Sequence, residues 1–309
     1  MRILQLAEIQ RVLAYGEIVG RMREALIAWS RGECDMPMPM HLGIAAVNAE
    51  VHIKASYRRG GKYFALKMAG TFPGNLARGL PVGNGMMLLS SADTGEPVAF
   101  LADAGHLTDV RTAAVAALVA RELGRRDGVL GILGSGIQAR LQARMHAEIL
   151  PLRQICIWGR NPERAAQCRS ELQAALPQIE IALAGSPADV AKAARLVVTA
   201  TASRVPLLHA CDVRAGTHIS AVGSDSPGKQ ELDADILRRA ALLLVDSRRQ
   251  CEKLGELQHA ADQAGRAVEM GEYCDAPVAF DSAGITVADF TGLGVEDLYI
   301  AEYCYLGAL

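Results

Sequence analysis

The sequence predicts an α/β protein with a doubly wound parallel sheet, joined to a second, mixed α+β domain. The chain has 309 residues, which suits two domains better than one or four. Hydrophobic residues make up 50% and charged residues 21% of the chain, so it can bury a sizeable core. From about Asp127 onward, short apolar runs alternate with stretches of helix length. That alternation is typical of a parallel sheet covered by helices on both faces.

The part of the chain before Asp127 has a mixed pattern. Apolar residues recur at helical spacing over 18–30 and predict a helix there. Two pairs of predicted strands follow, each pair around a turn: Val51–Ala55 with Tyr63–Met68, and Gly85–Leu89 with Pro97–Leu101. An alanine-rich helix is expected over 108–125, with Thr108 or Asp109 as its N-cap.

The later part of the chain is regular. Six apolar runs predict strands, namely Val129–Leu133, Ile155–Trp158, Ile179–Leu183, Leu196–Thr199, His218–Val222 and Leu242–Val245. Stretches such as 138–150 and 163–176 have helix length. A last helix is expected over 295–309, and it is expected to return to the first domain.

A glycine-rich turn follows the first of these strands directly and opens a helix. It reads Gly134-Ser135-Gly136-Ile137-Gln138-Ala139, a G-x-G-x-x-A pattern. Gly134 permits a tight turn, Gly136 lets the backbone approach a pyrophosphate, and Ala139 lets helix and strand pack closely. The start of the helix presents free N–H groups to phosphates. The context therefore predicts a Rossmann-type dinucleotide site rather than an ordinary strand–helix turn.

The end of the second strand indicates which dinucleotide binds. Sites for NAD usually place Asp or Glu there, but this chain has Trp158-Gly159-Arg160-Asn161. Arg160 could hold a 2′-phosphate through charge-assisted hydrogen bonds. NADP(H) is therefore favoured and NAD(H) stays possible, with a solvated loop arginine as the alternative interpretation of Arg160.

Four charged residues are candidates for binding a substrate or moving its proton. Lys67 lies within an apolar strand, and Lys54 has the same pattern on the neighbouring strand, where a solvent-facing position is an equal alternative. Two cations on paired strands repel each other unless an anion lies between them. Arg111 begins a helix, where a cation is unfavourable unless it meets an anion, such as a ligand or Asp109.

Asp225 follows a predicted strand of the parallel sheet, at the edge where such sheets bind ligands. A carboxyl group at that edge can give and take a proton. The alternative is an Asx turn before Pro227, which would explain the residue type by itself.

With these residues in view, the chain resembles the ornithine cyclodeaminase/mu-crystallin family from about Val51 to Asp297. The segments that carry the resemblance are Lys67 with Phe72-Pro73-Gly74-Asn75, Gly79-Leu80-Pro81, Thr94-Gly95-Glu96-Pro97, Leu107–Ala114, the glycine turn, and Val222–Lys229. The Thr-x-x-Arg-Thr-Ala-Ala and Asp-x-Pro-Gly-Lys runs are the most specific of them.

The resemblance implies a two-domain homodimer. Residues 1–113 with 290–309 would form the substrate-binding and dimerisation domain, and 114–289 the dinucleotide-binding Rossmann domain. Lys67 and Arg111 would bind the substrate carboxylate, and Asp225, together with Lys67, would be catalytic near the substrate nitrogen. The expected dinucleotide-binding residues are Asn84, Arg111, Thr112, Gly134, Ser135, Gly136, Ile137, Gln138, Arg160, Asn161, Thr201, Val222, Gly223, Lys229 and Gly292.

The chain departs from the family pattern at one place. Many members carry an arginine in a Pro-x-Arg segment as a further carboxylate ligand, whereas 37–42 here reads Pro-Met-Pro-Met-His-Leu. Lys54 resembles a family branch that uses this lysine instead. An NAD(P)-dependent enzyme reducing a small imino acid, or oxidising the matching amino acid, is therefore expected. The alternatives are an ornithine cyclodeaminase, which makes proline and ammonia, and a non-catalytic NADPH-dependent binding protein.

Composition and spacing argue against other classes of protein. The formal net charge is -2 without a basic block, so we expect no nucleic-acid partner. We expect no membrane partner either, because no apolar run approaches the roughly 18–20 residues that span a bilayer, and the N-terminus has no secretory pattern. Seven scattered cysteines without a C-x-x-C pair favour a cytoplasmic protein with reduced thiols. No H-E-x-x-H spacing occurs, so no metal is expected.

Overall fold

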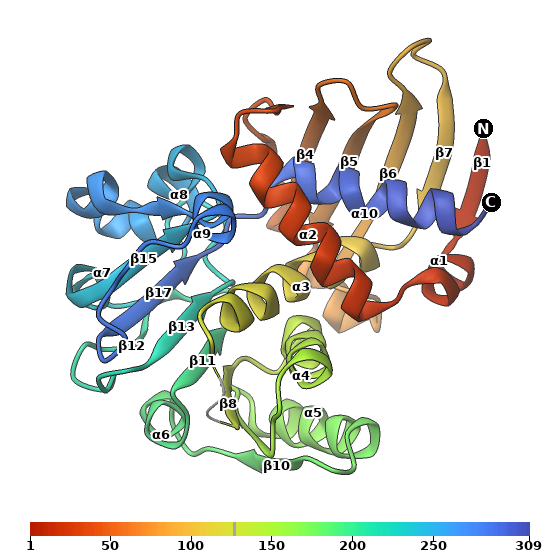
Figure 1. The fold of residues 1–309 in the computed structure, drawn as a ribbon. Coiled ribbons are helices and arrows are strands. Elements are labelled where there is room, and N and C mark those ends of the chain that lie inside the picture. Colours follow the sequence, from red (N-terminus) through yellow and green to blue (C-terminus); the bar gives the residue numbers. More distant parts are fainter. Residues whose placement is uncertain (126–127) are drawn as a thin grey trace. The chain divides into compact units, whose positions relative to one another are not determined.

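The computed structural model describes residues 1–125 and 128–309, which form two compact units (Figure 1). The first unit comprises Met1–Arg111 together with Leu293–Leu309, and the second comprises Thr112–Gly292. The C-terminal segment thus belongs to the same unit as the N-terminal part. Asp127, where the sequence pattern changes, lies outside the described residues.

The second unit contains an eight-stranded sheet in which every described pair of neighbouring strands is parallel. In spatial order the strands are β10 (Glu180–Leu183), β9 (Gln154–Trp158), β8 (Val129–Leu133), β11 (Leu196–Thr199), β13 (His218–Ala221), β17 (Ile285–Asp289), β15 (Ala240–Val245) and β16 (Val268–Glu269). From β8 the strands follow one another in chain order to β10 on one side and to β13 on the other, and β17 is then inserted before β15 and β16. The predicted doubly wound parallel fold is thus confirmed.

Helices cover this sheet, and a small second sheet accompanies it. The helices are α4 (Ile137–Ile149), α5 (Pro162–Ala175), α6 (Pro187–Ala193), α7 (Ala234–Arg239), α8 (Arg248–Leu254) and α9 (Met270–Asp275), with 3₁₀ turns η3 (Glu256–His259) and η4 (Ala261–Arg266). In Figure 1, α4 and α5 lie on one side of the strands near β8, and α6 lies on the other. The short strands β12 (Arg204–Leu208) and β14 (Gln230–Leu232) pair with each other.

The first unit is built on a mixed seven-stranded sheet. Its strands are β1 (Arg2–Gln5), β2 (Cys34–Asp35), β3 (Met40–Ile44), β4 (Ala49–Arg58), β5 (Tyr63–Thr71), β6 (Gly83–Ser91) and β7 (Pro97–Ala102). The two predicted strand pairs are present as β4–β5 and β6–β7. The parallel pairing of β1 with β7 was not predicted from the sequence. The unit also holds α1 (Leu6–Val12), α2 (Tyr15–Ser30), η1 (Ala45–Val47), η2 (Pro73–Arg78) and α10 (Gly294–Gly307).

The two faces of this mixed sheet differ in their cover. Helix α10 packs on β4, β5 and β6, and α2 packs on α10 (Figure 1). The opposite face is apolar and open to solvent: Met40, Leu42, Leu66 and Met68 are 62%, 53%, 37% and 38% exposed. The strand register puts all four on that one face, because Met40 and Met68 both lie opposite Ile53.

Helix α3 (His106–Glu122) contains the boundary between the two units. It begins earlier than the sequence predicted, because the buried carboxylate of Asp103 accepts a hydrogen bond of 2.8 Å from the Leu107 backbone N–H. The prediction of Thr108 or Asp109 as N-cap was therefore wrong. The helix also ends before residue 125, since Gly124 adopts a left-handed conformation with φ of 67°.

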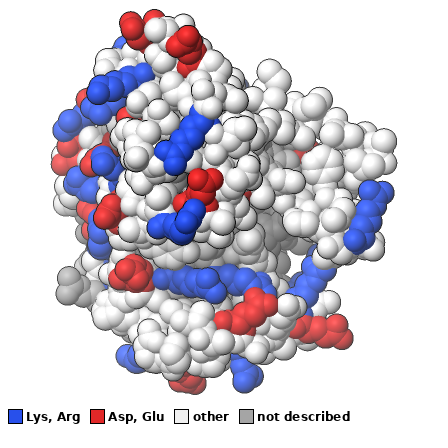
Figure 2. Space-filling model, turned by 90° about the vertical axis from the view of Figure 1, so that its right-hand side faces the viewer, with Lys and Arg blue, Asp and Glu red and all other residues white. Residues whose placement is uncertain are grey.

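Two properties of the structure relate to the expectations about membrane and nucleic-acid partners. Among the described residues, no helix is both long and apolar enough to cross a bilayer. On the face shown in Figure 2, lysine and arginine side chains are interspersed with acidic ones, as the near-zero net charge predicts.

Candidate active site

Two lysines lie side by side on the helix-covered face of the first unit's sheet. Lys54 of β4 pairs directly with Lys67 of β5, and their relative exposures are only 8% and 3%. The solvent-facing interpretation of Lys54 was therefore wrong. Such a pair of buried cations needs an anion nearby. The structure provides one from the first unit itself, because Asp297 of α10 lies 3.4 Å from Lys67 Nζ.

Arg111 joins this group through two carboxylates on the first turn of α10. Its Nε donates to Asp297 at 3.0 Å, and its Nη1 donates to Glu296 at 2.9 Å. Acidic side chains are favourable at a helix N-terminus, which explains why they gather there. We call Lys54, Lys67, Arg111, Glu296 and Asp297 the buried charge cluster. It contains three basic and two acidic side chains, all of them buried.

Burial changes the protonation of this cluster. Removal from water lowers the pKa of Lys67 from 10.5 to about 7, although the Asp297 carboxylate opposes this shift. For Asp297, burial acts to raise the pKa, but the neighbouring Lys67 and Arg111 outweigh it and hold the pKa below the usual value. Lys67 can therefore exchange its proton near neutral pH while Asp297 stays ionised.

The predicted glycine turn of the second unit has the backbone that a phosphate site needs. Gly134 has φ of 134°, and a Cβ there would lie 2.5 Å from the Ala200 carbonyl oxygen, so only glycine fits. A Cβ at Gly136 would meet nothing within 4 Å, which leaves the outer side of the turn open. Helix α4 begins at the next residue without a side-chain cap, so its first N–H groups are oriented toward this opening.

Five more of the predicted dinucleotide residues lie on two segments of the second unit, at the start of α4 and after β9. Ser135 and Gln138 are half-buried and Ile137 is 58% exposed at the start of α4. After β9, Arg160 is exposed and Asn161 caps α5 by accepting from Arg164 N at 2.9 Å. Two other predicted residues lie elsewhere in the chain. Thr112 lies within α3, and Asn84 lies on β6 of the first unit.

One buried glutamate fixes the loops that follow β11 and β13. The Glu231 carboxylate accepts hydrogen bonds from Thr199 Oγ1 at 2.6 Å, Thr201 N at 2.6 Å, Thr201 Oγ1 at 2.7 Å and Gly223 N at 2.9 Å. Burial raises its pKa, while these hydrogen bonds act in the opposite direction. Thr201 and Gly223, both predicted dinucleotide residues, are thereby held together beside the buried Val222.

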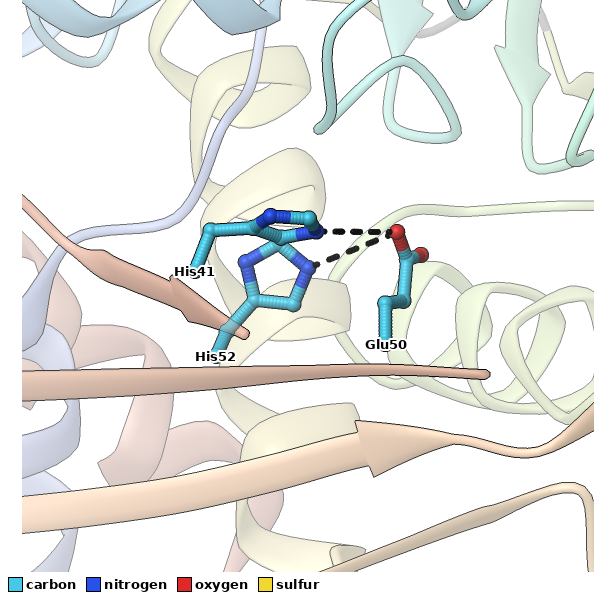
Figure 3. Close-up of side chains that lie close together, drawn as sticks. All are labelled: His41, Glu50 and His52. Atoms are coloured by element: carbon cyan, nitrogen blue, oxygen red, sulfur yellow. Dashed lines mark ion pairs between the residues drawn. The ribbon is translucent and has the colours of Figure 1, made fainter. Parts of the chain in front are cut away.

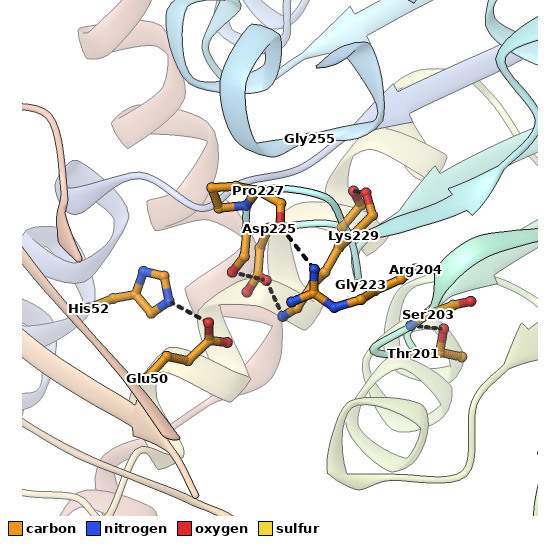
Figure 4. Close-up of polar contacts among 12 residues, drawn as sticks. Glu50, His52, Thr201, Ser203, Arg204, Gly223, Asp225, Pro227, Lys229 and Gly255 are labelled. Atoms are coloured by element: carbon orange, nitrogen blue, oxygen red, sulfur yellow. Dashed lines mark hydrogen bonds and ion pairs between the residues drawn. The ribbon is translucent and has the colours of Figure 1, made fainter. Parts of the chain in front are cut away.

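Asp225 and Lys229 form an ion pair on the loop after β13. Lys229 Nζ lies 2.7 Å from Asp225 Oδ1, and Ser226 Oγ donates to the same oxygen at 3.1 Å (Figure 4). The side chain of Asp225 is 47% exposed and that of Lys229 15% exposed. Lys229 was expected beside the dinucleotide, and here it contacts the predicted acid/base residue of the same loop. The aspartate is thus accessible and held by a neighbouring cation.

Gly292 is positioned by another buried carboxylate. Asp246, at the end of β15, accepts hydrogen bonds of 2.6 Å from the backbone N–H groups of Thr291 and Gly292, and one of 2.9 Å from Thr291 Oγ1. Sequence reasoning missed this role, together with those of Glu231, Glu296 and Asp297. The only local signal was the acidic pair at the start of the last predicted helix.

The parallel sheet, its glycine turn and the polar groups along its carboxyl edge define a Rossmann-type protein. The family model described as "Ornithine cyclodeaminase/mu-crystallin family" matches residues 1–308. The chain belongs to this family, and the resemblance seen in its sequence is confirmed.

Relatives support the same assignment. An uncharacterised cyclodeaminase of Sinorhizobium fredii is 38% identical over 283 residues, which cover 87% of this chain and 84% of that protein. Δ1-Pyrroline-2-carboxylate reductase of Thermococcus litoralis, solved with NADH and L-proline, has a TM-score of 0.92 at 25% identity, covering 100% of this chain and 97% of that one. An archaeal alanine dehydrogenase dimer with bound NAD has a TM-score of 0.90 at 26% identity, covering 100% and 96%. The predicted enzyme class is thus confirmed for the family.

Proposed function

We propose that this protein is an NAD(P)-dependent oxidoreductase that reduces a small imino acid, or oxidises the matching amino acid. The observation that carries the proposal is the gathering of three buried basic side chains, Lys54, Lys67 and Arg111, in the buried charge cluster. A substrate carboxylate is the kind of anion that such side chains bind through charge-assisted hydrogen bonds. The solved relatives are described as a reductase with bound L-proline and as an alanine dehydrogenase, and both amino acids carry a carboxylate.

Within this proposal the first unit binds the carboxylate. Lys54 and Lys67 would contact it, and Arg111, held by Glu296 and Asp297, would present a fixed cation to it. Lys67 gains a partner that favours its charged form, so substrate binding would raise the pKa of its ammonium group from about 7. The carboxylate would thus be held by a cluster that needs little rearrangement.

The second unit would hold the dinucleotide and supply a proton. Gly134, Gly136 and the start of α4 suit its pyrophosphate, and the bound nicotinamide would supply or accept hydride. Asp225 would give a proton to the substrate nitrogen or take one from it, with Lys229 holding its carboxylate in place. Arg160 favours NADP(H), because it is exposed at the strand end and no acid precedes it there. NAD(H), which both solved relatives carry, is the other candidate.

We further propose a cytoplasmic homodimer. The exposed apolar face formed by Met40, Leu42, Leu66 and Met68 would be the subunit interface, and the similar archaeal alanine dehydrogenase is described as a dimer. In the part of the chain that the structure describes, no cysteine forms a disulfide bond, and six of the seven are buried, as suits a reducing compartment.

Two assays test the proposal. Purified protein is titrated with NADPH and NADH by fluorescence, and then supplied with pyruvate plus methylamine or with a cyclic ketimine. We expect oxidation of the reduced cofactor, and we expect Asp225→Asn to abolish turnover while leaving cofactor binding intact. Conversion of ornithine to proline and ammonia without net cofactor oxidation would instead favour the cyclodeaminase that the Sinorhizobium relative's name suggests. Tight ligand binding without any turnover would favour a binding protein.

A further inference from the structure

Three side chains suited to metal binding converge on the first unit's sheet, outside the buried charge cluster. Glu50 and His52 project from one face of β4 because they are two residues apart. His41 of β3 lies directly opposite His52 and projects from the same face. Figure 3 shows both imidazole rings directed toward the Glu50 carboxylate. These three residues form a cluster that sequence spacing alone did not reveal.

The distances between the donor atoms are close to those of a coordination sphere. Glu50 Oε2 lies 3.5 Å from His41 Nε2 and 3.9 Å from His52 Nε2, and the donor atoms of the three residues all lie within 4.8 Å of one another. Ligands of zinc bind at about 2.0–2.2 Å in a tetrahedral arrangement, which places neighbouring donor atoms roughly 3.4 Å apart. Small rotations of the side chains would therefore bring all three onto one ion.

We propose that His41, Glu50 and His52 bind a divalent transition-metal ion of the zinc class. Two imidazoles and one carboxylate suit zinc or cobalt rather than magnesium or calcium, which prefer oxygen ligands. Three protein ligands leave a fourth position open for water or another small ligand. The hydrogen-bonded strands β3 and β4 fix the backbone of all three residues, so little order has to be gained when the ion binds.

The alternative is that the two histidines only form ion pairs with Glu50. In that case each histidine would bind the carboxylate best when protonated, whereas a metal needs both imidazoles unprotonated. The side-chain exposures are 46% for His41, 24% for Glu50 and 18% for His52. An ion could therefore enter from solvent and still be partly shielded from it.

Titration of the full-length, tag-free protein with Co²⁺ and Zn²⁺ distinguishes the two possibilities. After treatment with EDTA, calorimetry is expected to show one Zn²⁺ per chain, and Co²⁺ is expected to give visible d–d absorption typical of four- or five-coordinate nitrogen and oxygen ligation. His41→Ala, His52→Ala and Glu50→Gln should each weaken binding at least about tenfold, because even outer-sphere changes at metal sites cost ten- to a hundredfold.

His209→Ala is the matched control. His209 also lies near a carboxylate, 3.6 Å from Asp233, but its side chain is 59% exposed and it belongs to no such cluster among the described residues. Its removal should leave the affinity unchanged. Absence of stoichiometric binding to the wild type, or equal affinity in the three cluster variants with unchanged circular dichroism, would overturn the proposal. Both readouts are independent of enzyme activity, so they also separate this proposal from the proposed oxidoreductase function.

Discussion

Asp297 accepts a hydrogen bond of 3.0 Å from Nε of Arg111, and both side chains are almost completely buried. The two residues are 186 positions apart in the chain, so this bond ties the C-terminal helix α10 to the start of α3 within the first unit. The same carboxylate lies beside Lys67. One carboxylate thus holds the arginine in place and favours the charged form of the lysine, while burial of the lysine acts in the opposite direction.

Activity is expected to depend on pH through Lys67. Its pKa in the folded protein is about 7, so the free enzyme loses this positive charge as the pH rises above 7. The value of kcat/KM should then fall, approaching tenfold per pH unit, because kcat/KM reports groups of the free enzyme. Steady-state assays from pH 6 to 9 with Lys67→Arg as the comparison measure this. The arginine variant stays charged over this range, so its kcat/KM should not fall at alkaline pH. The same fall of kcat/KM above pH 7 in this variant would rule out Lys67 as the titrating group.

The stability of the protein should show the opposite trend from the same lysine. The pKa of Lys67 is about 7 when folded and near 10.5 when unfolded, so between these values the unfolded chain binds more protons. The contribution of Lys67 to the free energy of unfolding therefore increases as the pH rises from 7 to 10.5. Urea unfolding of the wild type and of Lys67→Met across this pH range measures the effect. The free energy of unfolding should rise more steeply with pH in the wild type than in the variant. Parallel curves would contradict the burial of an ionisable lysine.

Removal of the Asp297 charge is expected to destabilise the folded protein. Asp297→Asn leaves Lys67 and Arg111 buried with one anion fewer, and breaking a buried pair on one side costs about 3–5 kcal/mol. Glu24→Gln, in the exposed Arg21–Glu24 pair, should cost less than about 1 kcal/mol and serves as the control. The pKa of Lys67 should also fall below 7, so the alkaline limb of kcat/KM should move to lower pH. Equal stability of the two variants would show that Asp297 does not stabilise the buried charges of Lys67 and Arg111.

The sequence was most informative where the structure depends on local pattern. The strands Val129–Leu133 and Leu196–Thr199 were predicted with the bounds that the structure has, because a fully buried parallel strand is one continuous apolar run. The glycine turn was recognised for a similar reason, since its conformation depends on a few adjacent residues. Residue patterns marked Lys67, Arg111 and Asp225 as candidates for substrate binding or proton transfer, and the family resemblance gave each of them a specific role.

Contacts between distant segments could not be predicted in this way. The charges of Glu296 and Asp297 were visible in the sequence, but their pairing with Arg111 depends on how α10 returns to the sheet. The neighbours of Glu50 likewise depend on the register that places His41 opposite His52. Local spacing along the chain cannot reveal such a cluster, because residues that pair across two strands have no fixed separation in the sequence.

Two substitutions in the glycine turn should have separate effects, one on the stability of the protein and the other on its affinity for the dinucleotide. Gly134→Ala should destabilise the protein by about 1–3 kcal/mol, because its φ is positive and its Cβ would overlap the Ala200 carbonyl. Gly136→Ala should leave the unfolding temperature unchanged, because φ there is -86° and the added methyl group meets no other atom. It should nevertheless weaken NADPH binding by at least about tenfold, since the methyl group would keep the pyrophosphate from the backbone. Gly16→Ala, at an open position of α2, is the control for nucleotide affinity. Unaltered cofactor affinity in Gly136→Ala would place the dinucleotide elsewhere.

Cofactor preference is expected to depend on Arg160. The side chain is exposed after β9, and replacing it by serine removes the cation that would meet a 2′-phosphate. The dissociation constant for NADPH should rise about tenfold, corresponding to roughly 1.4 kcal/mol, while that for NADH should change little. Arg169→Ser, on the exposed side of α5, controls for the general loss of a positive charge. Fluorescence titrations with both cofactors at two ionic strengths measure the difference. If Arg160→Ser weakens NADPH and NADH equally, Arg160 does not read the 2′-phosphate, and the preference for NADP(H) loses its basis.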